Sequence, residues 1–94
     1  MITLVTVTYN AASTIERTLL SVERQTYRDV QHIIMDGGSK DGTVAMAEAY
    51  KQRNADLDVT VVSERDKGLY DAMNKAIDLA NGDYVCFLNA GALL

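Results

Sequence analysis

The sequence has 94 residues, of which 48% are hydrophobic and 23% charged, and its formal net charge at pH 7 is −4. This length suits a single small domain over residues 1–94, and the negative charge argues against a broad basic surface for nucleic acid. The single cysteine excludes an internal disulfide, and no apolar run approaches the ~18 residues that span a bilayer. We therefore expect a compact cytoplasmic protein.

The first predicted strand, residues 2–8, is rich in apolar and β-branched residues, as expected for a strand buried on both faces. No Gly-x-Gly-x-x-Gly motif follows it, which argues against a dinucleotide-binding Rossmann domain. A Ser-x-x-Glu capping box beginning at Ser13 predicts the start of a helix. Apolar residues at i, i+4 and i+7 from Ile15 continue this helix to about residues 25–27.

The second predicted strand, residues 30–35, ends abruptly in a glycine-rich acidic turn over residues 36–43. In a parallel sheet, Asp36 would lie at the carboxyl end of this strand as a hydrogen-bond acceptor, and the glycines would let the backbone approach a ligand. The turn lacks the Lys of a Walker loop and the alternating oxygen ligands of a calcium loop. An ordinary strand-to-helix turn is the alternative interpretation.

Two further residues near this turn have structural interpretations. His32, the only histidine, lies inside the second strand and is expected to be a packing residue rather than a ligand. A helix is predicted over residues 43–53, and Asp41 is placed to cap or favour its N-terminus.

The third predicted strand, residues 59–62, leads into a segment dense in charge over residues 63–68. This segment is either a solvated turn or a cationic loop. In the second interpretation, Arg65 and Lys67 bind a phosphate or donate to the edge of a base.

The last part of the sequence predicts one more helix and one more strand. Apolar residues follow helical spacing from Leu69 to Ala80, and Asn81-Gly82 supplies a C-terminal stop. The fourth strand covers residues 84–88, and its Cys86 is expected to be a small buried hydrophobic residue.

The order β-α-β-α-β-α-β predicts an α/β fold with three layers, a mainly parallel four-stranded sheet between helices. Polar clusters follow each of the four strands, so they should meet at one edge of the sheet. Open α/β sheets bind ligands at this edge, which favours a nucleotide-type site.

Five stretches carry a family resemblance: residues 5–10 (VTVTYN), 25–27 (QTY), 36–43 (DGGSKDGT), 67–76 (KGLYDAMNKA) and 82–89 (GDYVCFLN). Together they resemble the N-terminal half of family 2 glycosyltransferases, which have the Rossmann-like GT-A fold, and in particular the bacterial polysaccharide-synthesis branch. The resemblance covers essentially the whole chain.

The resemblance implies a site for a nucleotide-diphosphate sugar, usually a UDP- or GDP-sugar, and a glycan or lipid-linked acceptor. Thr8 and Tyr9 would line the base and ribose, and Asp36 would accept a hydrogen bond from the base ring. Arg65 and Lys67 would close over the base and phosphates. The residues implied in nucleotide-sugar binding are Thr8, Tyr9, Asn10, Asp36, Gly37, Ser39, Arg65, Lys67 and Asn89.

The resemblance also implies a divalent metal, Mg²⁺ or Mn²⁺, held by an Asp-x-Asp motif to stabilise the leaving diphosphate. The expected carboxylates are missing, because residues 89–92 read Asn-Ala-Gly-Ala, and Asp83 lies toward the opposite end of the strand. No metal ligand and no general base is assigned, since the family's acceptor half would lie beyond Leu94. We therefore expect a truncated, inactive donor half whose exposed C-terminal edge, with Leu93 and Leu94, favours self-association.

Two other functions fit the same sequence. One is a non-catalytic nucleotide-binding module, which the missing carboxylates favour. The other is a structural fragment that self-associates without binding a ligand. For an enzyme of the resembled family, we expect a cytoplasmic location or a peripheral one at the inner face of the membrane.

Overall fold

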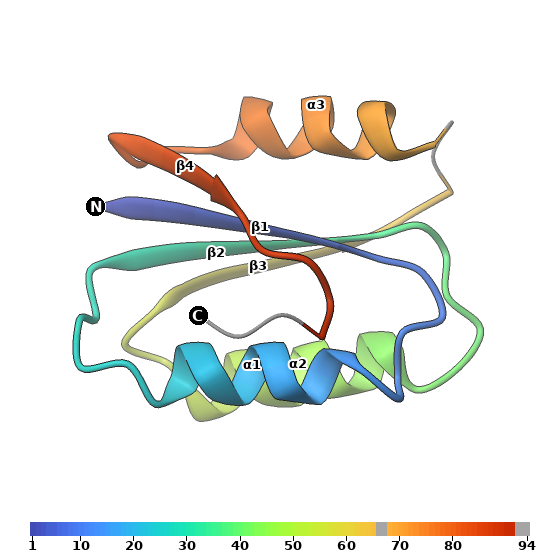
Figure 1. Cartoon of the computed structure of the whole chain (residues 1–94), viewed down its shortest axis with the longest axis horizontal. Helices are drawn as coiled ribbons and strands as arrows, with labels where there is room; N and C mark the ends of the chain where they lie inside the picture. The colour runs from blue at the N-terminus through green and yellow to red at the C-terminus, as the bar shows by residue number, and fades with distance from the viewer. Residues whose placement is uncertain (66–67, 92–94) are drawn as a thin grey trace.

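The computed structural model describes residues 1–65 and 68–91. Strands and helices alternate along the chain, as the sequence predicted (Figure 1). The elements are β1 (Ile2–Thr8), α1 (Ile15–Glu23), β2 (Val30–Asp36), α2 (Thr43–Arg53), β3 (Asp58–Ser63), α3 (Leu69–Leu79) and β4 (Tyr84–Phe87).

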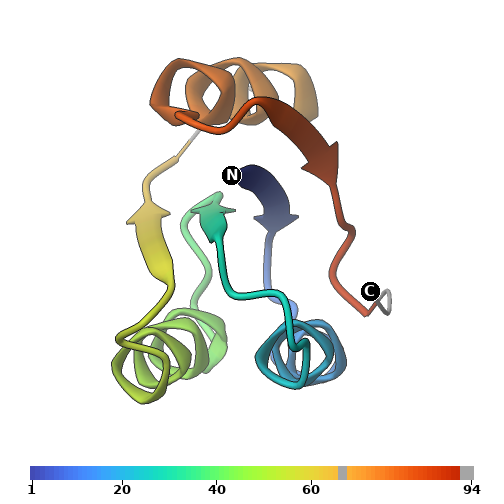
Figure 2. The same ribbon diagram turned by 90° about the vertical axis from the view of Figure 1, so that its left-hand side faces the viewer.

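The four strands form one sheet in the order β3-β2-β1-β4, and all three pairings are parallel. Helices α1 and α2 cover one face of this sheet, and α3 covers the other (Figure 2). Connections between parallel strands are right-handed, so the direction of each step across the sheet decides which face its helix covers. The steps from β1 to β2 and from β2 to β3 run in one direction, whereas the step from β3 to β4 runs in the opposite direction. The predicted three-layer α/β fold is confirmed.

The sheet divides the hydrophobic core in two, because alternate residues of a strand point to opposite faces. On the face of α1 and α2, Leu4 and Ile34 pack against Ile15, Leu19 and other helix residues. On the opposite face, a smaller cluster joins the sheet to α3; its buried members are Val5, Ile33, Met35, Ala72 and Ala76.

A buried polar group crosses the larger cluster. His32 is fully buried, its Nε2 lies 2.9 Å from the Thr6 hydroxyl, and its Nδ1 lies 2.8 Å from the Tyr50 hydroxyl. Burial lowers the pKa of His32 from 6.5 to about 4 and raises the pKa of Tyr50, so both groups are neutral at pH 7. The prediction that His32 is a packing residue is confirmed.

The N-termini of α1 and α2 are stabilised differently from each other. The N-cap of α1 is Thr14 and makes no side-chain capping bond, so the predicted capping box at Ser13 is wrong. At α2, the carboxylate of Asp41 accepts from the backbone N–H of Thr43 at 3.0 Å, and also from its hydroxyl. The predicted role of Asp41 at this helix terminus is confirmed, from one position before the N-cap residue, Gly42.

Gly82 follows the end of α3, where the sequence predicted a stop at Asn81-Gly82, and it also has a second role. Helix α3 ends at Leu79, and positive φ angles occur at Gly38, Gly68 and Gly91 rather than at Gly82. A Cβ at Gly82 would lie 2.5 Å from Thr3 Oγ1 and 2.7 Å from Thr3 N. The position therefore needs glycine because the chain passes directly against β1.

Strand β4 is short and lies at the edge of the sheet. Its Phe87 is in register with Val5, three residues before β1 ends, and all four of its residues are exposed. The predicted burial of Cys86 is wrong, since its side chain is exposed. Of the helices in the described part of the chain, none combines the length and apolar character needed to cross a membrane.

Candidate functional site

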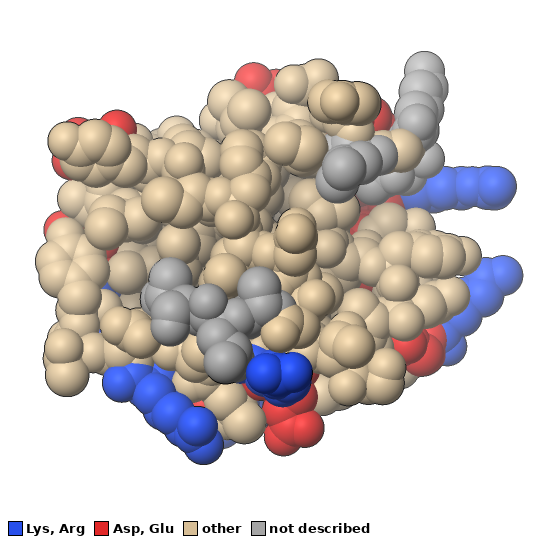
Figure 3. Space-filling model, in the orientation of Figure 1, with Lys and Arg blue, Asp and Glu red and all other residues tan. Residues whose placement is uncertain are grey.

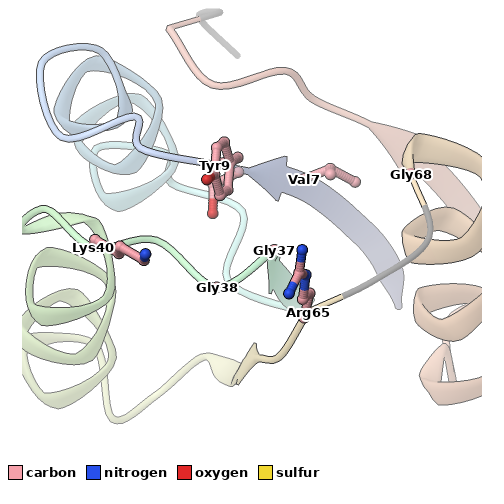
Figure 4. Close-up of a pocket in the computed structure, with 8 residues that line it drawn as sticks. Val7, Tyr9, Gly37, Gly38, Lys40, Arg65 and Gly68 are labelled. Carbon is pink, nitrogen blue, oxygen red and sulfur yellow. The ribbon is translucent and has the colours of Figure 1, made fainter.

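A cavity of about 670 Å³ opens where β1, β2 and β3 end (Figure 4). The strand ends are tied together, since Gly37 N donates to Thr8 O at 2.9 Å and Glu64 N donates to Asp36 O at 2.9 Å. The predicted meeting of strand ends at one edge is thereby confirmed for these three strands. The cavity is lined by Val7, Thr8, Tyr9, Gly37, Gly38, Lys40, Arg65 and Gly68.

Asp36 lies behind the wall of this site and is only 2% exposed. Its Oδ1 accepts from the hydroxyls of Thr8, at 2.7 Å, and Ser39. Its Oδ2 accepts from the N–H groups of Ser39 at 2.7 Å and Gly38 at 3.1 Å, and from the Ser63 hydroxyl at 2.8 Å. Five donors thus surround one carboxylate, whose two oxygens offer about four lone-pair positions.

These hydrogen bonds decide the charge of Asp36. Burial alone would raise its pKa, but the bonds from Ser39, followed by those from Thr8 and Ser63, hold the pKa below its ordinary value. Asp36 is therefore ionised at pH 7, with its negative charge directed into the protein.

The loops after β1 and β2 are joined by a second set of hydrogen bonds. Asn10 N donates to Ser39 Oγ at 2.7 Å, and Asn10 Oδ1 accepts from Lys40 N at 2.9 Å. Ala12 N also donates to the Asp41 carboxylate at 3.2 Å. Asn10 can make both of its contacts because it adopts a positive φ of 47°, a conformation that asparagine tolerates. The cavity wall is thus fixed before any ligand binds.

The open side of the cavity carries aromatic and cationic groups. Tyr9 is 63% exposed at the end of β1. Figure 4 shows Lys40 and Gly68 at opposite ends of the cavity, with Tyr9 and Arg65 between them. Gly38 has a positive φ of 87°, a conformation that favours glycine, and its backbone lies beside that of Arg65. Basic side chains project from this edge of the molecule (Figure 3).

The segment that carries Arg65 is attached to α3. Lys75 Nζ lies 3.0 Å from Glu64 Oε1 and 3.3 Å from Asp71 Oδ2. The hydrogen bond that Lys75 donates to Glu64, followed by the one that it donates to Asp71, raises the pKa of Lys75. Glu64 is thereby held beside the helix, one residue before Arg65.

Most of the predicted site residues lie at this edge. Thr8, Tyr9, Gly37 and Arg65 line the cavity, whereas Asn10, Asp36 and Ser39 support its wall from behind. Lys67 lies outside the described residues. The sequence interpretation missed Lys40, although a lysine between Gly38 and Gly42 in a predicted ligand-facing turn could have indicated it.

Comparison with known proteins identifies the family of this chain. The family model for glycosyl transferase family 2 matches residues 3–91. This chain belongs to glycosyltransferase family 2.

Curated relatives of this family 2 chain include bacterial glycosyltransferases that are named for the biosynthesis of particular products. It is 36% identical over 90 residues to a PGL/p-HBAD biosynthesis glycosyltransferase of Mycobacterium tuberculosis, covering 96% of this chain and 35% of the relative. It is 39% identical over 83 residues to the amylovoran biosynthesis glycosyltransferase AmsB of Erwinia amylovora, covering 87% and 28%. The chain therefore spans about a third of the length of these relatives.

Solved structures of glycosyltransferases share the fold. The mannosyltransferase PcManGT of Pyrobaculum calidifontis, in complex with GDP-Man and Mn²⁺, superposes with a TM-score of 0.90 at 32% identity, over 98% of this chain and 28% of that one. TarS 1–349 of S. aureus, in complex with UDP-GlcNAc, gives a TM-score of 0.85 at 26% identity, over 96% and 26%. The GT-A assignment from the sequence is confirmed.

The residues after β4 do not fit the divalent metal that a family 2 glycosyltransferase implies. Asn89 is absent from the cavity lining, and its backbone carbonyl accepts from the Thr18 hydroxyl at 3.1 Å, which directs the segment toward α1. Asp83 is held beside the N-terminal ammonium of Met1 at 3.3 Å. Within residues 1–65 and 68–91, no three His, Cys, Asp or Glu side chains come together as metal ligands. The binding role predicted for Asn89 stays a prediction.

Proposed function

We propose that residues 1–94 are the donor-binding domain of a family 2 glycosyltransferase and that the cavity binds a nucleotide-diphosphate sugar. The observation that carries this proposal is the position of the cavity, at the carboxyl ends of three adjacent parallel strands, where α/β sheets bind nucleotides. It is supported by the likeness to a mannosyltransferase in complex with GDP-Man and to TarS in complex with UDP-GlcNAc.

Each group at the cavity has a role in this proposal. The exposed ring of Tyr9 offers a flat surface for the base and ribose. Arg65 offers a guanidinium that suits phosphate oxygens, and Lys67 would add a second cation. Asp36 would fix the loop that holds the base. It would not accept a hydrogen bond from the base itself unless it first lost one of the hydrogen bonds that Ser39 and Ser63 donate to it.

The proposed reaction breaks the bond between the anomeric carbon of the donor sugar and the diphosphate, and a hydroxyl of the acceptor forms the new bond. The leaving diphosphate gains charge, which cationic groups at its binding site stabilise. No general base is assigned among the described residues. We therefore propose that the 94-residue chain binds the donor without transferring it; the acceptor, a glycan or lipid-linked sugar, and a location at the inner face of the membrane stay predictions.

Calorimetric titration tests this function. GDP-mannose and UDP-N-acetylglucosamine, each with and without Mn²⁺, should include at least one ligand that binds. Arg65→Ala should weaken that binding about fivefold or more, because a charge-assisted contact is lost. Arg24→Ala, an exposed change at the C-cap of α1 with the same loss of charge, is the control and should leave the affinity unchanged. Absence of binding for every nucleotide sugar would overturn the proposal.

A second candidate, a nucleotide-binding module without catalysis, is favoured by the lack of carboxylates after β4. It predicts that binding is unaffected by Mn²⁺ and by Asn89→Ala. A metal requirement in the same titrations would argue against this module, because it would show that this chain binds the ligand together with the metal.

Self-association through β4 is the third part of the proposal. This edge strand exposes 72% of Tyr84, 39% of Val85 and 45% of Phe87, and the centre of the face that it crosses carries few charges (Figure 3). An exposed apolar edge strand can pair with a second copy. Sedimentation of the wild-type chain should show dimers that Phe87→Lys abolishes; a monomer at all concentrations would contradict this part alone. Leu93 and Leu94, named in the sequence prediction, lie outside the described residues.

A further inference from the structure

Lys75 on α3 is not among the residues that line the cavity, and the proposed function gives it no role. We infer that Lys75 is a positioning residue: it holds the carboxylate of Glu64 against α3, so that the guanidinium of Arg65 stays free for the anionic part of the ligand. This inference rests on the proposed function, since it names the group that keeps a cation of the cavity available.

The first step is that Arg65 has no carboxylate partner. It is exposed and lines the cavity, and the ion pairs found within residues 1–65 and 68–91 do not include it (Figure 4). Other arginines are paired, such as Arg28 with Asp56 at 2.7 Å. A guanidinium has only donors, so an unpaired one in a cavity suits an anionic ligand such as a diphosphate.

The second step is that a carboxylate lies one residue away from this guanidinium, on Glu64. An unrestrained carboxylate beside an exposed guanidinium forms an ion pair with it, and a ligand must break that pair in order to bind. Ion pairs between exposed side chains change an equilibrium constant by up to about fivefold. The affinity for an anionic ligand therefore depends on where the Glu64 carboxylate is held.

The third step is that Lys75 holds this carboxylate on the face of α3. Val62 packs in the cluster beneath α3, and Glu64, two residues further, is directed to the same face. Lys75 Nζ lies 3.0 Å from Glu64 Oε1. It also lies 3.3 Å from Asp71 Oδ2, one turn earlier in the helix, which keeps the ammonium group at this position.

The packing of α3 places Lys75 within reach. Ala72 and Ala76 are fully buried against the sheet, and their small side chains let the helix lie close to it. Lys75 lies beside them on the same helix, so its long stem can extend over the end of β3. The side chain of Glu64 is 52% exposed, so its carboxylate can turn away once Lys75 is removed.

The test is calorimetric titration of GDP and UDP into the wild-type chain, Lys75→Met, Lys75→Arg, Glu64→Gln and the double variant Lys75→Met/Glu64→Gln. Lys75→Met should weaken binding about threefold, because the released carboxylate competes with the diphosphate for Arg65. Lys75→Arg should bind as wild type does, since arginine can also pair with Glu64. Glu64→Gln and the double variant should bind as wild type does, because neither has a carboxylate at this position.

Two controls make the result specific. Lys51→Met, which removes the same charge from an exposed position of α2, should leave the affinity unchanged. Urea denaturation of each variant separates binding from stability, since a purely structural role of Lys75 would not be reversed by Glu64→Gln. Recovery in the double variant also assigns the effect to Glu64 rather than to Asp66, which lies outside the described residues.

Three results would overturn the inference, and they differ in meaning. If the double variant binds as weakly as Lys75→Met, Lys75 does not act through Glu64. If Lys75→Met binds as wild type does, Glu64 does not compete for Arg65. In both cases the proposed function stands without this assignment. If wild type binds neither nucleotide, the proposed function itself fails together with the inference.

Discussion

Two buried titratable residues of β2, His32 and Asp36, differ in how the protein treats charge. Both are almost fully buried and both have a lowered pKa, but the consequences are opposite. The lowered pKa of His32 keeps the imidazole neutral in the middle of the sheet, where burial dominates. The lowered pKa of Asp36 keeps the carboxylate charged at the end of the strand, where five donors outweigh burial. Of these two buried residues, the one at the edge that forms the candidate site is the one that keeps its charge.

The largest expected effect comes from removing the charge of Asp36. Asp36→Asn places an amide among donors that come from Thr8, Ser39 and Ser63, so at least two of them lose an acceptor. We expect a loss of about 3 kcal/mol in the free energy of unfolding, from buried donors left without partners. Urea denaturation at pH 7 measures it. A loss below about 1 kcal/mol would mean that the charge of Asp36 matters little to the fold.

The two residues should also separate as the pH falls. The unfolded chain binds a proton at His32 near pH 6.5, whereas the folded chain does so only near pH 4, so the contribution of His32 is present above pH 6.5 and is lost as the pH falls toward 4. The total loss is about 3 kcal/mol, from a pKa difference of about 2.5 units at 1.36 kcal/mol each. The contribution of Asp36 is present above its ordinary pKa of 3.8 and disappears below it.

Urea denaturation between pH 7.5 and pH 4.5 checks this separation. His32→Gln should flatten the dependence of unfolding free energy on pH over that range. Equal slopes for wild type and His32→Gln would contradict the assignment to His32.

Removal of one hydrogen-bond partner should cost more at His32 than at Asp36. Tyr50→Phe deletes the hydroxyl 2.8 Å from His32 Nδ1 and leaves a buried ring nitrogen without a partner. We expect a loss of about 2 kcal/mol in unfolding free energy. Tyr27→Phe, at a tyrosine that is 51% exposed, is the matched control and should change stability by less than about 0.5 kcal/mol.

The smallest effect is expected at Ser63, the last residue of β3, which donates to Asp36. Ser63→Ala removes one of the five donors to Asp36, and the other four remain. The loss should be about 1 kcal/mol or less, because Ser63 itself is exposed and water can replace its hydroxyl. Thermal unfolding of Ser63→Ala and Tyr50→Phe side by side gives the comparison. A larger loss of stability for Ser63→Ala than for Tyr50→Phe would contradict the expectation that one lost hydrogen bond costs more at His32 than at Asp36.

Much of this fold was predictable because local signals agree with it. Apolar runs predicted the strands, and apolar residues spaced i, i+4 predicted α1 and α3. The alternation of strands and helices along the chain predicted a parallel sheet. The exposure of Cys86 was not predictable, because an apolar run does not reveal that its strand lies at the edge of the sheet. The requirement for Gly82 was also hidden, since it arises from contact with Thr3, distant in sequence.

The site was predictable in position but not in detail. A carboxylate after an apolar strand indicated that Asp36 would lie at the ligand edge. Its five donors come from three separate segments, so no local pattern shows that they surround it. Asn89 lies away from the cavity because β4 pairs with β1 only as far as Val5, after which the chain turns toward α1. The length of the predicted strand did not show this.

The hydrogen bonds that join the loops after β1 and β2 also bear on how the chain acquires its site. Residues such as Asn10 and Ser39 are 29 positions apart, and their contact requires that the intervening helix and both strands are already in place. We therefore expect the wall of the cavity to form late and as one cooperative unit. Amide hydrogens of this wall should exchange with solvent together, in a single opening event, rather than one loop at a time.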